Sequence, residues 1–373
     1  MEQQVKDDIQ RVFQLQKKQQ KALRASTAEQ RREKLQRFLD SVIAHEEEII
    51  EAIRKDVRKP YHEVKKAEIE GTKKAIRDNM NNLEQWMAPK EVGSSLSPDA
   101  NGILMYEPKD VTLILGPWNY PFMLTMAYTP LAASLAAGNS AIVKLSDFTM
   151  NTSNIAAKVI RDAFDEKEVA IFEGEVEVAT ELLDQPFDHI FFTGSTNVGK
   201  IVMTAAAKHL ASVTLELGGK SPTIIDSEYD LMDAAKKIAV GKFVNAGQTC
   251  IAPDYLFIKK DVQDKFAGIL QTVVNAGFME DDHTPDRSKF TQIVNDRDKP
   301  LALYVFSKKQ DMIDNVLQHT TSGNAAINDV VVHFSDVNLP FGGVNTSGIG
   351  SYHGVYGFKE FSHEKGVFIQ ASK

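Results

Sequence analysis

Apolar residues recur at helical spacing through the first ninety positions of the chain: Leu35, Phe38, Leu39, Val42, Ile43, Ile49, Ile50 and Ile53. The positions between them are dense in Lys, Glu, Gln and Arg, a pattern typical of amphipathic helices. Ser26 followed by Glu29 predicts a capping box at the start of the second helix, and Lys59-Pro60 predicts its end. A third helix is expected over residues 63–87.

The pattern changes near Thr112, where short apolar runs begin to alternate with helical stretches. The expected strands are residues 111–115, 141–144, 189–192, 213–217, 223–225, 256–258 and 301–306. This alternation predicts an α/β protein with largely parallel sheets. No internal repeat, low-complexity tract or long flexible linker interrupts it, so we expect a compact domain boundary near Ser212.

One uncharged stretch, residues 111–143, is longer than the roughly 20 residues that span a bilayer. Three prolines interrupt it, and Asn119 and Asn139 would need polar partners in lipid. We therefore expect a buried strand, a loop, a core helix and a second strand here, and no membrane span.

Composition narrows the class of protein. A chain of 373 residues with 43% hydrophobic and 25% charged residues is expected to form two or three domains. Acidic residues outnumber basic ones by 51 to 43, and no long basic run is present, which argues against nucleic-acid binding. Cys250 is the single cysteine, which excludes a disulfide framework and a cysteine-based zinc site, and the scattered histidines predict no metal site. The polar first ten residues contain no secretory signal, so a cytoplasmic location is expected.

A phosphate-binding candidate lies where an apolar strand turns through Gly194 and Ser195 into a helix that contains Gly199. A helix N-terminus offers free N–H groups and a partial positive charge to a pyrophosphate. The spacing departs from the G-x-G-x-x-G of an ordinary dinucleotide site, so a simple strand-to-helix turn is the alternative.

Cys250 follows the polar residues Gly247, Gln248 and Thr249. A lone cysteine is commonly a small buried apolar residue. A polar loop between rigid elements instead favours a nucleophile, which would need a base or local dipoles to become a thiolate.

Two further polar residues interrupt apolar or rigid surroundings. Glu216 ends an apolar strand beside Gly218 and is a candidate base, or else an ion-pair partner of Lys220 or a solvated charge at the strand end. Asn119 lies between two prolines, where its amide could face an oxyanion or satisfy loop backbone groups. The glycine-rich stretch 339–350 predicts tight turns, with the wall of a pocket as the second choice.

In order along the chain, these segments resemble the aldehyde dehydrogenase superfamily, and most of all its dimeric class 3 and fatty aldehyde branch. The resemblance covers nearly the whole chain from about residue 10, and its matching pieces are residues 116–121, 137–139, 143–144, 191–199, 215–222, 245–253, 299–306 and 339–343.

The resemblance implies a Rossmann-type cofactor domain over residues 1–87 and 107–212 and a catalytic α/β domain over residues 213–338. A bridging β arm from residues 88–106 and 339–373 would pair subunits of a homodimer. It also implies NAD or NADP as cofactor and a small-molecule aldehyde as substrate, with neither nucleic acid nor membrane as partner.

The resemblance further implies a mechanism. Cys250 would attack the aldehyde, Asn119 and the Cys250 backbone N–H would hold the oxyanion, and Glu216 would activate water to hydrolyse the thioester. Cofactor contacts would come from Trp118, Lys144, Asp147, Gly194, Ser195, Gly199, Leu217 and Gly218.

Three departures from the family pattern bear on activity. Leu145 replaces a proline and Asp147 a ribose-binding glutamate, which blurs the preference between NAD and NADP. Asn345 replaces a glycine, and asparagine tolerates positive φ better than most residues.

After Asn295 on the order of 70 residues are missing, about half a typical domain. They would include a strand and the Glu-Ile-Phe-Gly-Pro motif that grips the nicotinamide ribose.

The missing segment keeps other functions open. An impaired dehydrogenase is the first hypothesis, a silent relative that binds nucleotide or pairs with another subunit is the second, and a Cys250-dependent esterase is the third.

Overall fold

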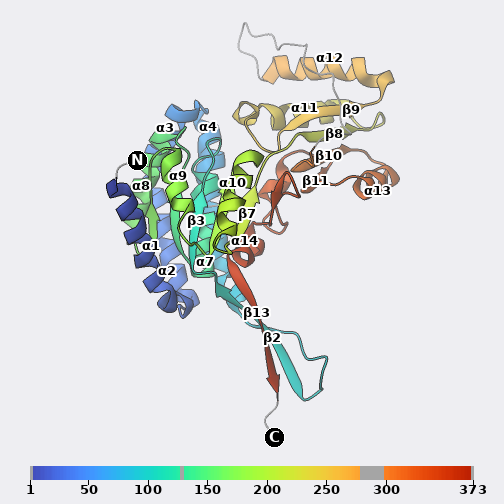
Figure 1. Cartoon of the computed structure of the whole chain (residues 1–373). Coiled ribbons are helices and arrows are strands. Elements are labelled where there is room, and N and C mark those ends of the chain that lie inside the picture. Colours follow the sequence, from blue (N-terminus) through green and yellow to red (C-terminus); the bar gives the residue numbers. More distant parts are fainter. Residues whose placement is uncertain (1–2, 127–129, 278–297, 371–373) are drawn as a thin grey trace. The chain divides into compact units, whose positions relative to one another are not determined.

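The computed structural model describes residues 3–126, 130–277 and 298–370 (Figure 1). The chain forms two compact units, Met1–Leu215 with Ser351–Lys373, and Glu216–Gly350. The division follows Leu215, a few residues beyond the boundary expected near Ser212, because the strand of residues 212–216 extends the sheet of the first unit.

The first unit begins with helices α1 (Gln3–Arg24), α2 (Ala28–Ala44) and α3 (Glu46–Val57). The capping box predicted from Ser26 and Glu29 is wrong by one residue: Thr27 is the N-cap and exchanges hydrogen bonds with Gln30. Ser26 instead donates to the Leu23 carbonyl.

The single helix predicted up to Lys59-Pro60 is two helices, separated at His45. There the backbone leaves helical geometry at φ −106° and ψ 13°. Three glutamates in the first turn of α3, Glu46, Glu47 and Glu48, favour a new helix start because they complement its N-terminal dipole.

The predicted helix over residues 63–87 is present but contains an unusual turn. It consists of α4 (Tyr61–Glu63), the π-helix η1 (Val64–Glu70) and α5 (Gly71–Met87). Short π-helical segments are rare and occur frequently at functional sites.

A mainly parallel sheet forms the centre of this unit, with strand order β7-β6-β3-β4-β5. Its strands are β3 (Val111–Leu115), β4 (Ser140–Lys144), β5 (Val169–Ile171), β6 (His189–Thr193) and β7 (Ser212–Glu216). Every residue of β3, β4 and β6 is buried, as expected for strands covered on both faces. The covering helices include α8 (Met150–Ala163), α9 (Val176–Leu183) and α10 (Thr196–Ala207), of which α10 packs on β6 and α8 on β5.

The uncharged stretch folds as predicted, with β3, a loop, the buried helices α6 (Met123–Met126) and α7 (Pro130–Ala137), and then β4. Within the part of the chain that the structure describes, no helix is long and apolar enough to cross a membrane.

A separate antiparallel sheet of this unit joins two distant segments. It contains β1 (Lys90–Glu91), β2 (Ala100–Pro108) and β13 (Ser362–Gln370), and β13 follows the short helix α14 (Gly354–Glu360). The β2–β13 ladder extends from Pro108 opposite Ser362 to Ala100 opposite Gln370, and Figure 1 shows it as a long ribbon.

The second unit has a parallel sheet with strand order β11-β10-β8-β9. Its elements are β8 (Ser221–Ile225), α11 (Leu231–Phe243), the 3₁₀ turn η2 (Val244–Gly247), β9 (Pro253–Ile258), α12 (Lys260–Gly277), β10 (Ala302–Phe306), α13 (Gln310–His319), β11 (Asn324–Ile327), η4 (Val332–Ser335) and β12 (Gly348–Ile349). Strand β10 pairs directly with β8, with Tyr304 opposite Thr223. The four strands are thus paired without a gap, while the join expected at Asn295 lies outside the described residues.

Together the two units confirm the predicted α/β class with largely parallel sheets.

Candidate active site

Three of the predicted site segments follow neighbouring parallel strands in the first unit. Leu115, the last residue of β3, is opposite both Lys144 of β4 and Phe192 of β6. The carboxyl ends of these strands therefore meet at one sheet edge. The strand order also reverses at β3, with β4 on one side and β6 on the other, and ligands of open α/β sheets bind at such switch points.

The turn between β6 and α10 has the features of a phosphate site. Ser195 is the N-cap of α10, and its hydroxyl accepts a hydrogen bond of 3.3 Å from the Val198 backbone N–H. A Cβ on Gly194 would lie only 2.4 Å from the Phe192 ring, so a larger residue here would have to displace that ring. Gly199 is buried in α10, which packs against β6.

Lys144 supplies a cation at the same edge. Its side chain is nearly buried, and its Nζ donates to the Leu145 carbonyl at 3.1 Å. Burial lowers the pKa of Lys144, and the charge of the exposed Asp147 opposes that shift. The ammonium has three protons, so it can donate to a ligand as well.

Asn119 is half-buried in the loop after β3, and Trp118 beside it is 42% exposed. The Asn119 carbonyl accepts a hydrogen bond from Lys59 Nζ at 3.3 Å. Lys59, predicted from the sequence only as a helix end, pairs with Glu68, a residue that the sequence motifs did not single out. Glu68 lies four residues after Val64, at a position where the helical pattern calls for an apolar residue. A charged residue at such a position is the sequence feature that could have identified Glu68 as a candidate.

Cys250, in the second unit, follows a turn with strained backbone. Asn245, Ala246 and Gly247 have φ of 53°, 54° and 75°, a run of left-handed residues that side chains disfavour. The Asn245 and Gln248 side chains stabilise the turn: Asn245 Nδ2 donates to the Gln248 carbonyl at 3.1 Å and Gln248 Nε2 to the Asn245 carbonyl at 3.0 Å. Such strain persists where the surroundings fix it and clusters at active sites.

The Cys250 thiol and the Glu216 carboxylate share a hydrogen bond. Glu216 is 2% exposed. Burial raises its pKa to about 8, although the hydrogen bond with Cys250 lowers the pKa and offsets part of the rise. The pKa of Cys250 also lies well above its usual value, first because of burial and then because of the Glu216 charge. Burial therefore disfavours the charged form of both side chains.

The pair has features that suit reaction chemistry. Glu216 Oε1 is buried and has no hydrogen-bond partner among the described residues, an expensive arrangement that a substrate or water would relieve. Backbone N–H groups of Cys250 and Ile251 face the sulfur and favour its negative charge. Lys220, the alternative partner proposed for Glu216, pairs with Asp254 at 3.2 Å.

The remaining second-unit candidates lie next to Glu216. The Leu217 N–H donates to the Ser347 carbonyl at 3.1 Å, which connects the Glu216 strand to the loop 339–350. A Cβ on Gly218 would meet no atom within 4 Å, so there is open space beside it. Asn345 has φ of 61°, as its tolerance of positive φ suggests.

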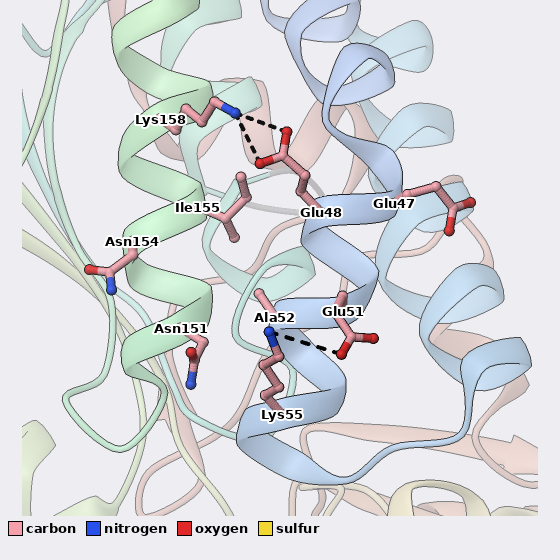
Figure 2. A pocket seen from close by; sticks show the side chains of 9 residues that line it. All are labelled: Glu47, Glu48, Glu51, Ala52, Lys55, Asn151, Asn154, Ile155 and Lys158. Carbon is pink, nitrogen blue, oxygen red and sulfur yellow. Dashed lines mark hydrogen bonds and ion pairs between the residues drawn. The ribbon is translucent and has the colours of Figure 1, made fainter.

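A surface hollow between α3 and α8 contains none of these residues. Figure 2 shows its charged lining, in which Lys158 Nζ is 2.9 Å from both carboxylate oxygens of Glu48. The candidate chemistry thus lies at strand ends and in the Cys250 loop.

Comparison with known proteins gives the family. The family model described as "Aldehyde dehydrogenase family" matches residues 1–289 and 283–367, nearly the whole chain. The chain belongs to the aldehyde dehydrogenase family.

Several relatives are similar over most of their length. AldX of Bacillus subtilis (strain 168) is 82% identical over 447 aligned positions that cover 100% of both chains. Aldehyde dehydrogenase family 3 member A2 of Mus musculus is 39% identical over 72% of this chain and 69% of its own. The 4,4'-diaponeurosporen-aldehyde dehydrogenase of Staphylococcus aureus is 33% identical over 92% and 90%.

Solved aldehyde dehydrogenases share the fold. A substrate-bound AldH of Staphylococcus aureus has a TM-score of 0.91 and 30% identity, and covers 98% of this chain and 94% of its own. The resemblance inferred from sequence motifs to an aldehyde dehydrogenase fold is therefore confirmed.

Proposed function

We propose that this aldehyde dehydrogenase oxidises an aldehyde to a carboxylic acid, with NAD or NADP, through a covalent intermediate on Cys250. The observation that carries the proposal is the buried Glu216 carboxylate, which interacts with Cys250 and has one oxygen without a hydrogen-bond partner among the described residues. A nucleophile beside a base, with N–H donors around the nucleophile, is the arrangement that acyl chemistry needs.

In the first step the Cys250 thiol loses its proton to solvent, the sulfur forms a C–S bond to the aldehyde carbon, and the carbonyl electrons move to the aldehyde oxygen. The resulting oxyanion is stabilised by the Cys250 backbone N–H and the Asn119 side-chain amide. Loss of a hydride from this carbon restores the C=O bond as a thioester, and a bound nicotinamide cofactor supplies the hydride acceptor.

Glu216 acts in the second step. Its carboxylate removes a proton from a water molecule, whose oxygen then attacks the thioester carbon and displaces the Cys250 thiolate. A carboxylate with a pKa of about 8 is a stronger base than an ordinary glutamate and suits this task.

The residues at the first-unit sheet edge fit a dinucleotide. The N–H groups of the first turn of α10 have no acceptor within the helix, and Gly194 and Ser195 precede them. We assign the pyrophosphate to this turn, with Gly199 allowing α10 to pack closely on β6. Lys144 and Asp147 would contact a ribose, and Trp118, Leu217 and Gly218 complete the proposed set.

The comparisons support either cofactor without choosing between them. A betaine aldehyde dehydrogenase of Staphylococcus aureus, 23% identical, was solved in complex with NAD+, and a 22% identical Escherichia coli protein is described as NADP dependent. Asp147 is one methylene shorter than the glutamate expected from the resemblance, so neither cofactor is strongly preferred in this proposal.

The test is NAD(P)H formation with a medium-chain and an aromatic aldehyde, using each cofactor in turn. Wild-type turnover that Cys250→Ser abolishes supports the proposal. Turnover that persists in Cys250→Ser would refute the covalent mechanism, and no turnover in folded protein would refute the activity.

One observation favours a second candidate, a silent relative with a binding or subunit-pairing role. The alignment to AldX has 447 positions for a chain of 373 residues, and the family model matches in two pieces, which supports a missing internal segment. Cofactor binding without turnover would favour this candidate. Under either function we propose a homodimer formed through β13, which is an edge strand of its sheet.

A further inference from the structure

The loop that presents Asn119 is attached to a fully buried ion pair. The side chains of Lys59 and Glu68 are both 0% exposed, and Lys59 Nζ lies 2.6 Å from Glu68 Oε1. Burying two charged side chains costs free energy unless their remaining hydrogen-bonding atoms also find partners. Those partners are on the Asn119 loop.

Each member of the pair contacts one end of the loop. Lys59 Nζ donates to the Asn119 backbone carbonyl at 3.3 Å, and Glu68 Oε2 accepts from the Met123 backbone N–H at 2.9 Å. Lys59 Nζ also lies 3.9 Å from the centre of the Tyr120 ring, a cation–π distance. The pair therefore fixes the backbone from Asn119 to Met123.

The local backbone explains how Lys59 and Glu68 meet. Arg58 ends α3 in the left-handed region, with φ of 54°, and Pro60 precedes the next helix, so Lys59 is held between two rigid turns. Glu68 belongs to the π-helix η1, whose wider turn changes the angular position of its side chains relative to an α-helix.

We propose that Lys59 and Glu68 are positioning residues that fix the Asn119 amide for the oxyanion. This inference rests on the proposed function, because it assigns the pair a role through Asn119. Oxyanion donors contribute only when they are held in place before the reaction, and small displacements cost about a hundredfold in rate.

The test combines substitutions of the pair with Asn119→Ala in the full chain. Lys59→Met and Glu68→Leu each leave one buried charge, so the double variant Lys59→Met/Glu68→Leu, which removes both charges, serves as the variant expected to fold. Lys73→Met is the matched control, because Lys73 pairs with Glu46 at 2.9 Å in the same helical region. Lys73→Met leaves the contacts of Lys59 and Glu68 with residues 119–123 in place.

We expect the double variant to lower kcat by about tenfold to a hundredfold, with KM and cofactor affinity changed by less than about twofold. In the Asn119→Ala background the same double substitution should have no further effect on kcat, because the group that it positions is gone. An equal loss of kcat in both backgrounds would overturn the proposal, since a merely structural role does not depend on Asn119.

Hydrogen exchange gives a readout that needs no turnover. The double variant should exchange faster in the peptide that contains Met123, whereas Lys73→Met should leave this peptide unchanged. If the wild type has no dehydrogenase activity, the proposed function fails, and the exchange result still decides whether the pair holds the loop. Unchanged exchange at Met123 would overturn the inference.

Discussion

Replacing Glu216 by glutamine separates two roles that the carboxylate could have toward Cys250. If Glu216 is the base that activates water, it should leave the Cys250 thiol protonated, and its negative charge should lower the fraction of Cys250 present as thiolate. As a base for the thiol, it should promote the thiolate. The electrostatics favour the first role, because the Glu216 charge and its interaction with the thiol both raise the pKa of Cys250.

The size of the effect follows from the Glu216 pKa of about 8. At pH 7 the carboxyl is about one-tenth ionised and at pH 9 about nine-tenths, since each pH unit changes the ratio tenfold. Removing the carboxylate should therefore have little effect on thiolate population at pH 7. At pH 9 it should raise that population by up to about tenfold.

Alkylation by iodoacetamide measures the thiolate directly, and Cys250 is the only cysteine of the chain. We expect wild type and Glu216→Gln to react at similar rates at pH 7. The variant should become faster as the pH rises through about 8, where Glu216 of the wild type ionises.

Two control variants define the measurement. Cys250→Ser gives the background, and Glu228→Gln removes an exposed carboxylate of the same unit that pairs with Lys309. Glu228→Gln should follow the wild-type profile. Slower alkylation of Glu216→Gln throughout the pH range would refute the reasoning, because it would show that Glu216 generates the thiolate.

Four further predictions concern the first unit. Asn119→Ala should lower kcat by about a hundredfold to a thousandfold and leave cofactor affinity unchanged, as measured by steady-state kinetics and cofactor titration. Lys144→Met should weaken cofactor binding by about tenfold or more because a charge-assisted hydrogen bond is lost, and Asp147→Glu should lower the KM for NAD relative to NADP. His189 is fully buried with its pKa well below 6.5, so the unfolded chain binds a proton that the folded chain does not. Stability should therefore fall as the pH drops below about 6.5, seen as a lower urea midpoint at pH 5 than at pH 7.5, and His189→Gln should reduce that dependence.

The strands of this protein were the most predictable elements. Apolar runs placed β3, β4, β6 and β10 to within a residue, because strands buried on both faces leave continuous hydrophobic segments. Strand β5 was missed because Val169–Ile171 is too short to stand out from its surroundings.

Helix ends were harder to predict because several residues compete for the cap. Ser26 and Thr27 are adjacent and chemically alike, and only backbone geometry selects Thr27, which has the extended φ and ψ that an N-cap requires. The break at His45 lies inside an apolar period that continues from α2 into α3, so periodicity alone cannot reveal it.

Contacts of the candidate site depend on three-dimensional proximity. The sequence suggested Cys250 and Glu216 as separate reactive residues, but only the fold shows that their side chains interact. The left-handed backbone at Ala246 carries no sequence signal, since alanine rarely adopts positive φ.

Ionisable residues at apolar positions connect the fold to the proposed chemistry. Glu216 ends an apolar strand, Lys144 ends another, and Glu68 occupies the buried face of a helix. Each raises the cost of folding, because a buried charge or polar group must be paired or held neutral. Such exceptions to the hydrophobic pattern are expected mainly where function requires them. Among the described residues, Glu216 has an oxygen without a hydrogen-bond partner, and Lys59 and Glu68 each form a hydrogen bond with the backbone of the Asn119 loop. The same reasoning that identifies Glu216 as a base therefore identifies the Lys59–Glu68 pair as part of the machinery that positions Asn119.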